Sequence, residues 1–421
     1  MPAERNTILV RGRPAVCWGD VRERAERRFT ARLSDLASSR ILFVVDGWDG
    51  ALDALCFSHA HDLDVCIVDA ARLTVETREA AGRAGLSLFD AATLSFARAD
   101  SPAAMRAGRV AVVTSGTTGS PKLVDHSWET LDTHRRARSL PPRRWFAPYQ
   151  IGSYASYQLL CLSMFHEGQD LVLGDLDDLA ASFSEALTAG VDAVSSTPTF
   201  WRFMLMSVAP NVLSRSGLKT ISLGGEIVDQ AILDRLRAQF PASAIRHIYA
   251  SSEAGAAIVV TDGLAGFPAS LLDVADSEIG LSVRDGRLFV RSAFSSHAPA
   301  ESGDAWRDTG DLVEMVDGRV HFRGRVSATI INVGGMKAFP AEVEAQLMRH
   351  PDVVWAQVFA RRAPMVGSLP SARIVLSNAR KADAEAEAEL TDYMQARVPA
   401  YAVPRFWQFL DNIPVKASLK S

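Results

Sequence analysis

A short polar stretch in the first third of the chain carries the residues best suited to chemistry. The apolar residues 110–113 run into Thr-Ser-Gly-Thr-Thr-Gly-Ser-Pro-Lys at positions 114–122. Hydroxyl groups and the backbone N–H groups exposed at glycines donate hydrogen bonds, and the lysine adds a positive charge, so this stretch is equipped to hold phosphate oxygens. We expect the phosphate contacts to come from Thr114, Ser115, Gly116, Thr117, Thr118, Gly119 and Lys122.

The glycine spacing distinguishes this loop from the P-loop of nucleoside triphosphatases. A P-loop has four residues between its two glycines, and a lysine directly follows the second. Here Gly116 and Gly119 are three positions apart, and Lys122 follows Ser-Pro. A kinase of the P-loop type is therefore disfavoured, and an ordinary surface turn is the alternative interpretation of the stretch.

The loop resembles the phosphate loop of the adenylate-forming superfamily, which contains acyl- and aryl-CoA synthetases, the adenylation domains of nonribosomal peptide synthetases, and luciferases. The sequence Ile-Tyr-Ala-Ser-Ser-Glu-Ala-Gly at 248–255 resembles a second motif of that superfamily. The resemblance implies that Tyr249 stacks on adenine and that Glu253 helps to hold Mg²⁺. Alanine replaces the usual glycine of this motif, and its second serine replaces the usual threonine. The nucleotide-binding residues implied here are Tyr249, Ala250, Ser251 and Ser252.

The same resemblance implies residues for the ribose and the adenine. Asp311 resembles the carboxylate that accepts both ribose hydroxyls, a task for two acceptor oxygens. Arg325 resembles the arginine that contacts the ribose. The loop after an expected strand at 219–223 resembles the loop that lies against adenine, and it consists of Gly224, Gly225 and Glu226.

Residues 145–155 resemble the segment that helps to form the acyl pocket. Relatives that activate amino acids place an aspartate here to pair with the substrate ammonium, and none occurs between positions 145 and 157. Burying an unpaired ammonium is costly, so an α-amino acid substrate is disfavoured. Ordinary core packing is the alternative interpretation for each pocket candidate. These candidates are Tyr149, Gln150, Ser153 and Tyr154.

The sequence after position 323 resembles the hinge and small C-terminal domain of the superfamily. The hinge is expected at 324–327, with Ser327 in place of the usual aspartate. The resemblance implies that a glycine pair and a nearby lysine face the passage for the arm of a thiol cofactor. These three residues are Gly334, Gly335 and Lys337.

The last residues match the spacing of a terminal motif whose lysine enters the active site. The match implies that Lys420 is catalytic, with Leu419 in place of the usual glycine. Lys416 is a second candidate for that role.

The elements that must position these residues alternate between strands and helices. Strands expected at 41–46 and 64–69 flank a helix at 50–61, a β-α-β pattern that favours parallel strands. Asp-Gly turns predict hairpins at 281–290 and 312–323. Other expected elements are helices at 127–139, 341–349 and 381–397, and strands at 352–360, 372–377 and 405–410.

This pattern and the resemblance predict an α/β fold. A large N-terminal domain of mostly parallel sheets covered by helices, with a β-rich subdomain, is expected at 1–323. A small, mobile α+β domain is expected at 328–421. The first hundred residues resemble the superfamily least and the phosphate loop comes early, so we expect a shortened N-terminal subdomain.

Composition narrows the classes of partner. The 45 basic and 49 acidic residues give a net charge of −4, which argues against a general nucleic-acid binder. The sequence contains no apolar run long enough for a membrane helix, and its start lacks the pattern of a signal peptide. Four cysteines without C-x-x-C spacing indicate reduced thiols, and hence a cytoplasmic protein.

The implied reaction uses ATP and Mg²⁺ to convert a carboxylic acid into an acyl-adenylate, with Lys420, Thr118 and Glu253 as catalytic residues. The acyl group would then pass to the thiol of CoA or of a phosphopantetheinyl carrier protein. Aryl or medium-length acyl acids fit the aromatic pocket segment. One alternative is an enzyme that passes an activated acid, including a small oxyacid such as nitrite, to an amine. Another is a nucleotide-binding homologue without turnover. The sequence does not identify the acid. It also leaves the oligomeric state open, with a homodimer among the alternatives.

Overall fold

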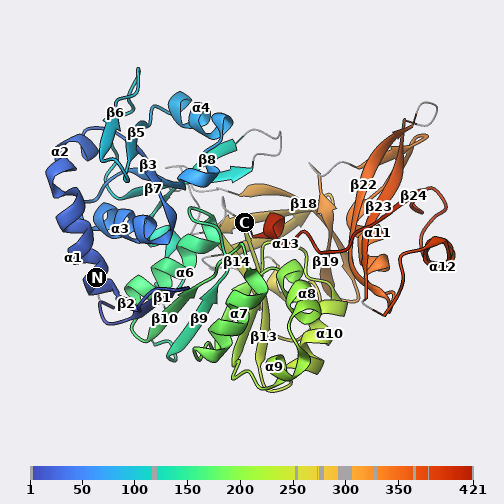
Figure 1. Ribbon diagram of the computed structural model, residues 1–421. Helices are drawn as coiled ribbons and strands as arrows, with labels where there is room; N and C mark the ends of the chain where they lie inside the picture. The colour runs from blue at the N-terminus through green and yellow to red at the C-terminus, as the bar shows by residue number, and fades with distance from the viewer. Residues whose placement is uncertain are drawn as a thin grey trace.

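The computed structural model describes residues 3–115, 121–135, 137, 139–251, 255–272, 274, 279–292, 306–326, 330–363, 367–377 and 379–419. Strands of the described residues form four sheets, and Figure 1 shows them with their helices. Three sheets belong to residues 3–326, which we call the main body. The fourth belongs to residues 330–409, the C-terminal lobe. No helix among the described residues is long and apolar enough to cross a membrane.

One sheet of the main body has six strands, in the order β6-β5-β3-β4-β7-β8. Its central strand β3 (Ile41–Val45) is buried along its whole length, as expected for a parallel strand covered on both faces. Strand β3 pairs in parallel with β4 and β5, while β7 and β8 form an antiparallel hairpin. The other strands are β4 (Val65–Asp69), β5 (Ser87–Asp90), β6 (Ser95–Ala97), β7 (Arg109–Ser115) and β8 (Pro121–Ser127).

A second sheet of the main body has eight strands, in the order β14-β13-β12-β11-β9-β10-β1-β2. Its six central strands run parallel, and the two edge strands β2 and β14 are antiparallel. The strands are β1 (Thr7–Val10), β2 (Val16–Cys17), β9 (Arg143–Ala147), β10 (Gln169–Leu173), β11 (Ala193–Ser196), β12 (Thr220–Leu223), β13 (Ala244–Ser251) and β14 (Gly255–Val260).

Helices pack against these two sheets, and several of them begin at a capping side chain. Thr197 caps α8 by accepting a hydrogen bond from Phe200 N, and Pro198 occupies the first turn, the position where proline costs no hydrogen bond. Asp229 caps α10 in the same way through Ile232 N. The helices are α1 (Trp18–Phe29), α2 (Leu33–Leu36), α3 (Gly47–Ala60), α4 (Val75–Arg83), α5 (Trp128–Leu131), α6 (Tyr154–Phe165), α7 (Leu179–Thr188), α8 (Pro198–Ser207), α9 (Pro210–Ser214) and α10 (Gln230–Gln239).

A five-stranded antiparallel sheet completes the main body, in the order β15-β19-β18-β17-β16. Both predicted Asp-Gly hairpin turns are present, with Asp285 and Asp317 at positive φ. The strands are β15 (Phe267–Pro268), β16 (Ile279–Arg284), β17 (Arg287–Ser292), β18 (Arg307–Val316) and β19 (Arg319–Arg325).

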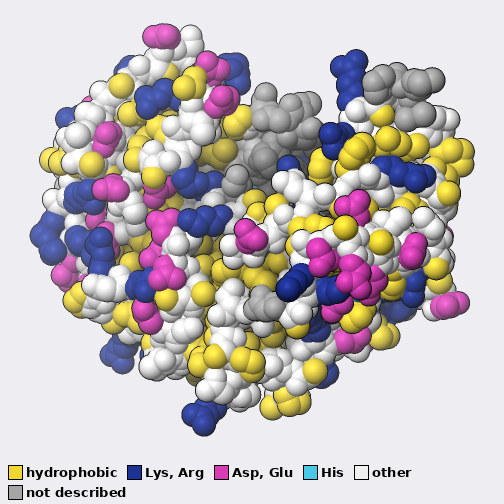
Figure 2. All heavy atoms as spheres, turned by 45° about the vertical axis from the view of Figure 1, so that its right-hand side comes forward, with side chains coloured by type: hydrophobic (Ala, Val, Ile, Leu, Met, Phe, Trp, Pro, Cys, Tyr) yellow, Lys and Arg dark blue, Asp and Glu magenta, His cyan; other side chains and the backbone are white. Residues whose placement is uncertain are grey.

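The C-terminal lobe has its own sheet and its own hydrophobic core, which includes Ile331, Leu347, Ile374 and Met394. In Figure 2 a notch at the top of the view separates the lobe, on the right, from the main body. The elements of the lobe are β20 (Ile331–Val333), β21 (Met336–Ala338), α11 (Pro340–Leu347), β22 (Val353–Ala363), β23 (Gly367–Leu376), α12 (Ala384–Gln395) and β24 (Phe406–Phe409).

The chain returns to the main body after the lobe. Residues 410–419, the terminal tail, include the short helix α13 (Val415–Ser418). Figure 1 shows α13 in the middle of the molecule, away from the lobe strands at the right. Ile413, Val415 and Leu419 belong to the large hydrophobic core of the main body.

The predicted α/β class is confirmed, including the β-rich region and the small α+β C-terminal part. The helix predicted at 127–139 is wrong in length. Ser127 caps it as expected, but helix α5 ends at Leu131. Asp132 leaves the helical conformation, and its carboxylate accepts hydrogen bonds from His166 Nε2 at 2.9 Å and from the His134 backbone N–H. The four cysteines form no disulfide.

Candidate active site

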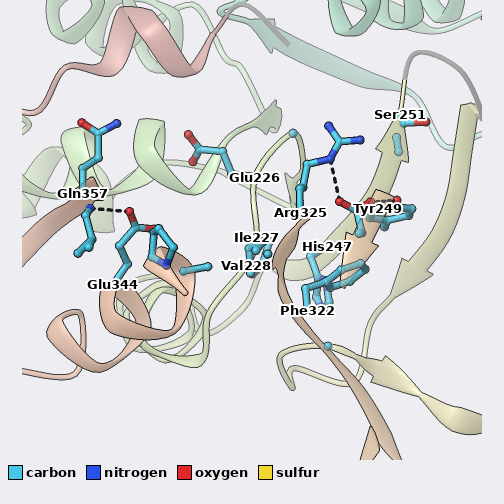
Figure 3. A pocket seen from close by; sticks show the side chains of 18 of the residues that line it. Glu226, Ile227, Val228, His247, Tyr249, Ser251, Phe322, Arg325, Glu344 and Gln357 are labelled. Atoms are coloured by element: carbon cyan, nitrogen blue, oxygen red, sulfur yellow. Dashed lines mark hydrogen bonds and ion pairs between the residues drawn. The ribbon is translucent and has the colours of Figure 1, made fainter. Parts of the chain in front are cut away.

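Asp311 lies at the centre of the candidate site, between a tyrosine and an arginine. The Tyr249 hydroxyl donates a hydrogen bond to Asp311 Oδ2, and Arg325 Nε lies 3.0 Å from Asp311 Oδ1. Arg325 also donates to the carbonyl of Thr309 at 2.9 Å, which fixes its guanidinium. Figure 3 shows Tyr249 and Arg325 side by side at one end of a cavity. The sequence-predicted ribose residues are thus in direct contact.

Two sheets supply these three side chains. Asp311 and Arg325 are directly opposite each other on the antiparallel strands β18 and β19. Tyr249 comes from β13 of the eight-stranded sheet, where the strand pairing shifts register between Tyr249 and Ala250. Such a bulge re-aims the neighbouring side chains. The site therefore forms only where the two sheets meet.

Burial controls the charge state of the pair formed by Asp311 and Tyr249. Asp311 is 7% exposed. Burial raises the pKa of its carboxyl, while the hydrogen bond from Tyr249 and the charge of Arg325 act in the opposite direction. Burial and the neighbouring carboxylate raise the pKa of Tyr249, so its hydroxyl stays protonated and remains a donor.

A cavity of about 640 Å³ adjoins this cluster, within the range usual for small-molecule sites. Phe322 lines it and stacks on Tyr249, with ring centroids 4.9 Å apart and planes tilted by 19°. Phe322 covers one face of Tyr249, so only the opposite face is left for a base. The sequence analysis missed Phe322, although the alternating pattern of β19 places an aromatic ring there. Other lining residues that the sequence indicated are Gly225, Glu226, Ala250, Ser251 and Arg325.

The loop after β12 forms another wall of the cavity. Gly225 has φ 78°, a conformation that favours glycine. The Glu226 carboxylate accepts a hydrogen bond from the Thr199 backbone N–H at 3.0 Å, and burial raises its pKa. Gly224 approaches β13 closely, because a side chain there would meet the carbonyl of Ile248 at 3.2 Å.

A second cavity of about 560 Å³ lies between α8, the lobe and the terminal tail. It shares Glu226 and Glu344 with the first cavity. Glu344, on α11, accepts a hydrogen bond from Val358 N at 2.7 Å, and burial raises its pKa to about 7. Neither glutamate forms an ion pair with a lysine or arginine in the part of the chain that the structure describes. Both are visible in Figure 3.

The predicted phosphate loop connects the hairpin strands β7 and β8. Thr114 and Lys122 are partners across that hairpin, and Thr114 Oγ1 lies 3.5 Å from the Lys122 carbonyl oxygen. Ser115 ends β7. The predicted contacts at Gly116, Thr117, Thr118 and Gly119 lie outside the described residues.

The four acyl-pocket candidates are all buried. Ser153 caps α6 by accepting from Ser156 N at 3.2 Å, and Tyr154 packs on the ring of His126. These contacts give Ser153 and Tyr154 structural roles. Gln150 instead contacts the terminal tail.

Several predicted residues lie away from both cavities or outside the described residues. Gly334 and Gly335 form the turn of the hairpin β20–β21, and Lys337 is exposed beside them. None of the three lines either cavity. Ser252, Glu253, Ser327 and Lys420 are not described. Within the described residues, no group of three His, Cys, Asp or Glu side chains is arranged to hold a metal ion.

Several curated proteins similar to this chain are CoA synthases or CoA ligases. A feruloyl-CoA synthase from Amycolatopsis sp is 26% identical over 333 residues, which cover 73% of this chain and 67% of the relative. A 2-succinylbenzoate–CoA ligase from Bacillus subtilis (strain 168) is 26% identical over 342 residues, which cover 75% of this chain and 68% of the relative.

Solved structures share the fold at lower identity. The anthranilate CoA ligase AuaEII in complex with anthranoyl-AMP has a TM-score of 0.73 and 17% identity, covering 99% of this chain and 92% of its own. The amide bond synthetase McbA from Marinactinospora thermotolerans has a TM-score of 0.71 and 20% identity. The match covers 99% of this chain and 95% of McbA.

Family profiles match most of the sequence. The profile of the AMP-binding enzyme family matches residues 27–293, and that of the AMP-binding enzyme C-terminal domain matches residues 342–420. The chain therefore belongs to the AMP-binding enzymes of the adenylate-forming superfamily.

Proposed function

We propose that this protein is an acid–thiol ligase that activates a carboxylic acid with ATP and transfers the acyl group to the thiol of CoA. The Asp311 carboxylate carries the proposal, because it is buried between Tyr249 and Arg325 at the edge of the 640 Å³ cavity. A fixed carboxylate of this kind suits the two hydroxyls of a ribose. The similar CoA ligases and the family assignment support the reaction.

The adenosine of ATP would lie in this cavity. One Asp311 oxygen accepts from Tyr249 and the other pairs with Arg325, and each oxygen keeps a lone pair for a ribose hydroxyl. The free face of Tyr249 would stack on adenine, with Gly224, Gly225 and Glu226 at its edge. Because Arg325 and Tyr249 already hold Asp311, little reorganisation is needed when the nucleotide binds.

Charge neutralisation is the main task at the phosphate end, since a carboxylate must attack a phosphate. The loop from Thr114 to Lys122 would hold phosphate oxygens, and Thr118 is its proposed catalytic residue. Glu253 would help to hold a Mg²⁺ ion, which supplies positive charge for the pyrophosphate leaving group, and the neighbouring Ser252 would contact the nucleotide. Lys420 would stabilise the charge that moves between the acid and the α-phosphate.

The second half-reaction requires another arrangement of the lobe. We place the domain boundary at the hinge 324–327, between a large domain 1–323 and a small domain 328–421. Rotation there would withdraw Lys420 and bring Gly334, Gly335 and Lys337 toward the site. A thiol can then attack the acyl carbon while the adenylate stays shielded from water. CoA is the proposed thiol, and a phosphopantetheinyl carrier protein is an alternative donor of the same group.

Pyrophosphate exchange tests the first half-reaction. ATP labelled from radioactive pyrophosphate should appear only when a suitable acid is present, and a panel of aryl and medium-length acyl acids identifies it. Mass spectrometry of the products with CoA should then show an acyl-CoA. Absence of exchange with every acid, at saturating ATP and Mg²⁺, would refute the proposal.

An amine acceptor is a second candidate. Glu226 and Glu344 line both cavities, and two buried carboxyl groups suit an amine better than the anionic phosphates of CoA, because a carboxylate can bind the ammonium form and take its proton before the neutral amine attacks. Incubation of the identified acid with ATP and amines in place of CoA distinguishes the two acceptors. An amide as the sole transfer product would replace the thioester assignment.

A further inference from the structure

The terminal tail is fixed to the main body by apolar burial. Leu419 is fully buried, and Ile413 and Val415 are 3% and 7% exposed. All three pack in the core that also contains Phe200 of α8. The side chain at position 419 therefore ties the tail to the main body.

Polar contacts from two separate elements hold the same tail. The Gln150 backbone N–H donates to the carbonyl of Leu419 at 3.3 Å, and the Gln150 side chain lies 3.5 Å from the carbonyl of Lys416. The hydroxyls of Thr197 and Ser418 are 3.0 Å apart. Thr197 has no exposed surface. The backbone on both sides of residue 418 is therefore held in one position.

The terminal tail, as described, contains one lysine, Lys416. Lys416 Nζ pairs with Asp177 at 2.7 Å, and both side chains are largely exposed, at 58% and 94%. That contact turns Lys416 toward solvent. Residue 420 follows directly after the anchored Leu419.

We infer that Leu419 is an apolar anchor and that Gln150 and Thr197 are positioning residues, which together fix the tail for adenylate formation and slow its release before acyl transfer. This inference rests on the proposed function, in which Lys420 acts only in the first half-reaction. Release of the tail would expose Leu419 to water, and exposing one leucine shifts an equilibrium by roughly tenfold or more. A glycine at this position has no side chain to bury. The tail of this chain is therefore biased toward the adenylating arrangement.

Substitutions in the tail separate positioning from folding. Leu419→Gly should slow acid-dependent pyrophosphate exchange about tenfold, with unchanged KM for ATP, because no residue of the tail lines the proposed nucleotide cavity. Transfer from a pre-formed acyl-adenylate should be faster in the same variant, since release no longer exposes an apolar side chain. Leu419→Met conserves volume and should restore both rates.

Ser418→Ala tests the polar contact without removing the cap of α8, which belongs to Thr197. The Ser418 hydroxyl contacts Thr197 and also donates to the Val415 carbonyl at 2.8 Å, so its loss should slow exchange roughly three- to tenfold and leave transfer at or above its normal rate. Asp411→Asn is the matched control, because Asp411 is an exposed residue of the same tail, and both rates should be unchanged. The inference is wrong if both half-reactions fall together in Leu419→Gly, or if neither changes.

Hydrogen exchange gives a readout that does not depend on the acid. Leu419→Gly should increase amide exchange in peptides covering 148–153 and 411–421, since Gln150 N–H loses its acceptor when the tail leaves. If the wild type shows no pyrophosphate exchange but this increase occurs, the anchor stands and the proposed function fails. If amide exchange is the same in wild type and variant, the anchor is refuted.

Discussion

Asp311 and Arg325 face each other across two antiparallel strands, with 3.0 Å between Oδ1 and Nε. Arg325 is also within the segment proposed as the hinge, one residue before Val326, whose N–H donates to the carbonyl of Gly310 at 2.7 Å. Arg323, two residues earlier, pairs with Glu342 of the lobe at 2.6 Å. The arginine that pairs with the ribose carboxylate and the arginine that pairs with the lobe are thus two residues apart on one strand, β19. Nucleotide binding and lobe position are expected to be coupled through it.

Asp311→Ala should weaken ATP binding. The variant removes the acceptor for two ribose hydroxyls and leaves Arg325 without its partner, which should cost about 1 to 3 kcal/mol at a buried site. Isothermal titration calorimetry with ATP measures the change. Asp262→Asn is the matched control, because Asp262 also pairs with an arginine of β19 but lies outside the cavity. Equal ATP affinity of Asp311→Ala and wild type would make Asp311 a structural residue only.

Glu344→Gln should remove a pH dependence of stability. Burial raises the pKa of Glu344 to about 7, above the unfolded value of about 4.3. The stabilisation that the protonated Glu344 contributes to the free energy of unfolding is therefore fully present below about pH 4 and is lost as the pH rises through about 7. The glutamine can still accept from Val358 N without a buried charge, so the variant should be more stable by roughly 1 to 3 kcal/mol at pH 8.

Urea unfolding at pH 5 and pH 8 checks this prediction. The difference between wild type and Glu344→Gln should be small at pH 5 and grow toward pH 8. Glu387→Gln, at an exposed position on α12, should follow the wild type at both values. A Glu344→Gln variant that is less stable at pH 8 would show that the ionised carboxylate stabilises the lobe.

The sequence predicted helices and strands well where the residues that determine an element lie within that element or next to it. The buried run of β3, the Asp-Gly turns and the proline that opens α11 each act within a few residues. Helix α5 was predicted too long, since Asp132 is engaged by His166, which is 34 positions away in sequence. Such a contact has no local signal.

The residues of the candidate site also divide into those that a sequence motif identified and those that only the packing of distant elements determines. The motif residues Tyr249, Asp311 and Arg325 were identified by resemblance, and the structure brings them together. Phe322 and Glu344 were missed, because stacking on Tyr249 and burial between lobe and main body depend on how separate sheets pack.

Glu253→Gln should shift the Mg²⁺ dependence of adenylate formation to higher concentration. The substitution replaces an anionic oxygen ligand with a neutral amide, which binds Mg²⁺ less strongly. Pyrophosphate exchange measured across a Mg²⁺ titration at fixed ATP gives the comparison. Glu23→Gln, at a largely exposed position of α1, should overlay the wild type. If Glu253→Gln also overlays it, the metal assignment is wrong.

Lys420→Ala should slow adenylate formation selectively. Removing one charge-stabilising donor from such a site typically costs about 10² to 10³ in rate, roughly 2.7 to 4 kcal/mol. Acid-dependent pyrophosphate exchange should fall by that factor, while the urea unfolding transition of the variant should match that of the wild type. Given pre-formed acyl-adenylate, it should still transfer the acyl group at a near-normal rate.

Lys416→Ala provides the comparison, because the structure pairs Lys416 with Asp177 at the surface. It should change neither half-reaction. If both half-reactions fell together in Lys420→Ala, that lysine would be structural. If only Lys416→Ala stopped the exchange, the catalytic ammonium would be four positions earlier in the chain, and its ion pair with Asp177 would have to break before ATP could react.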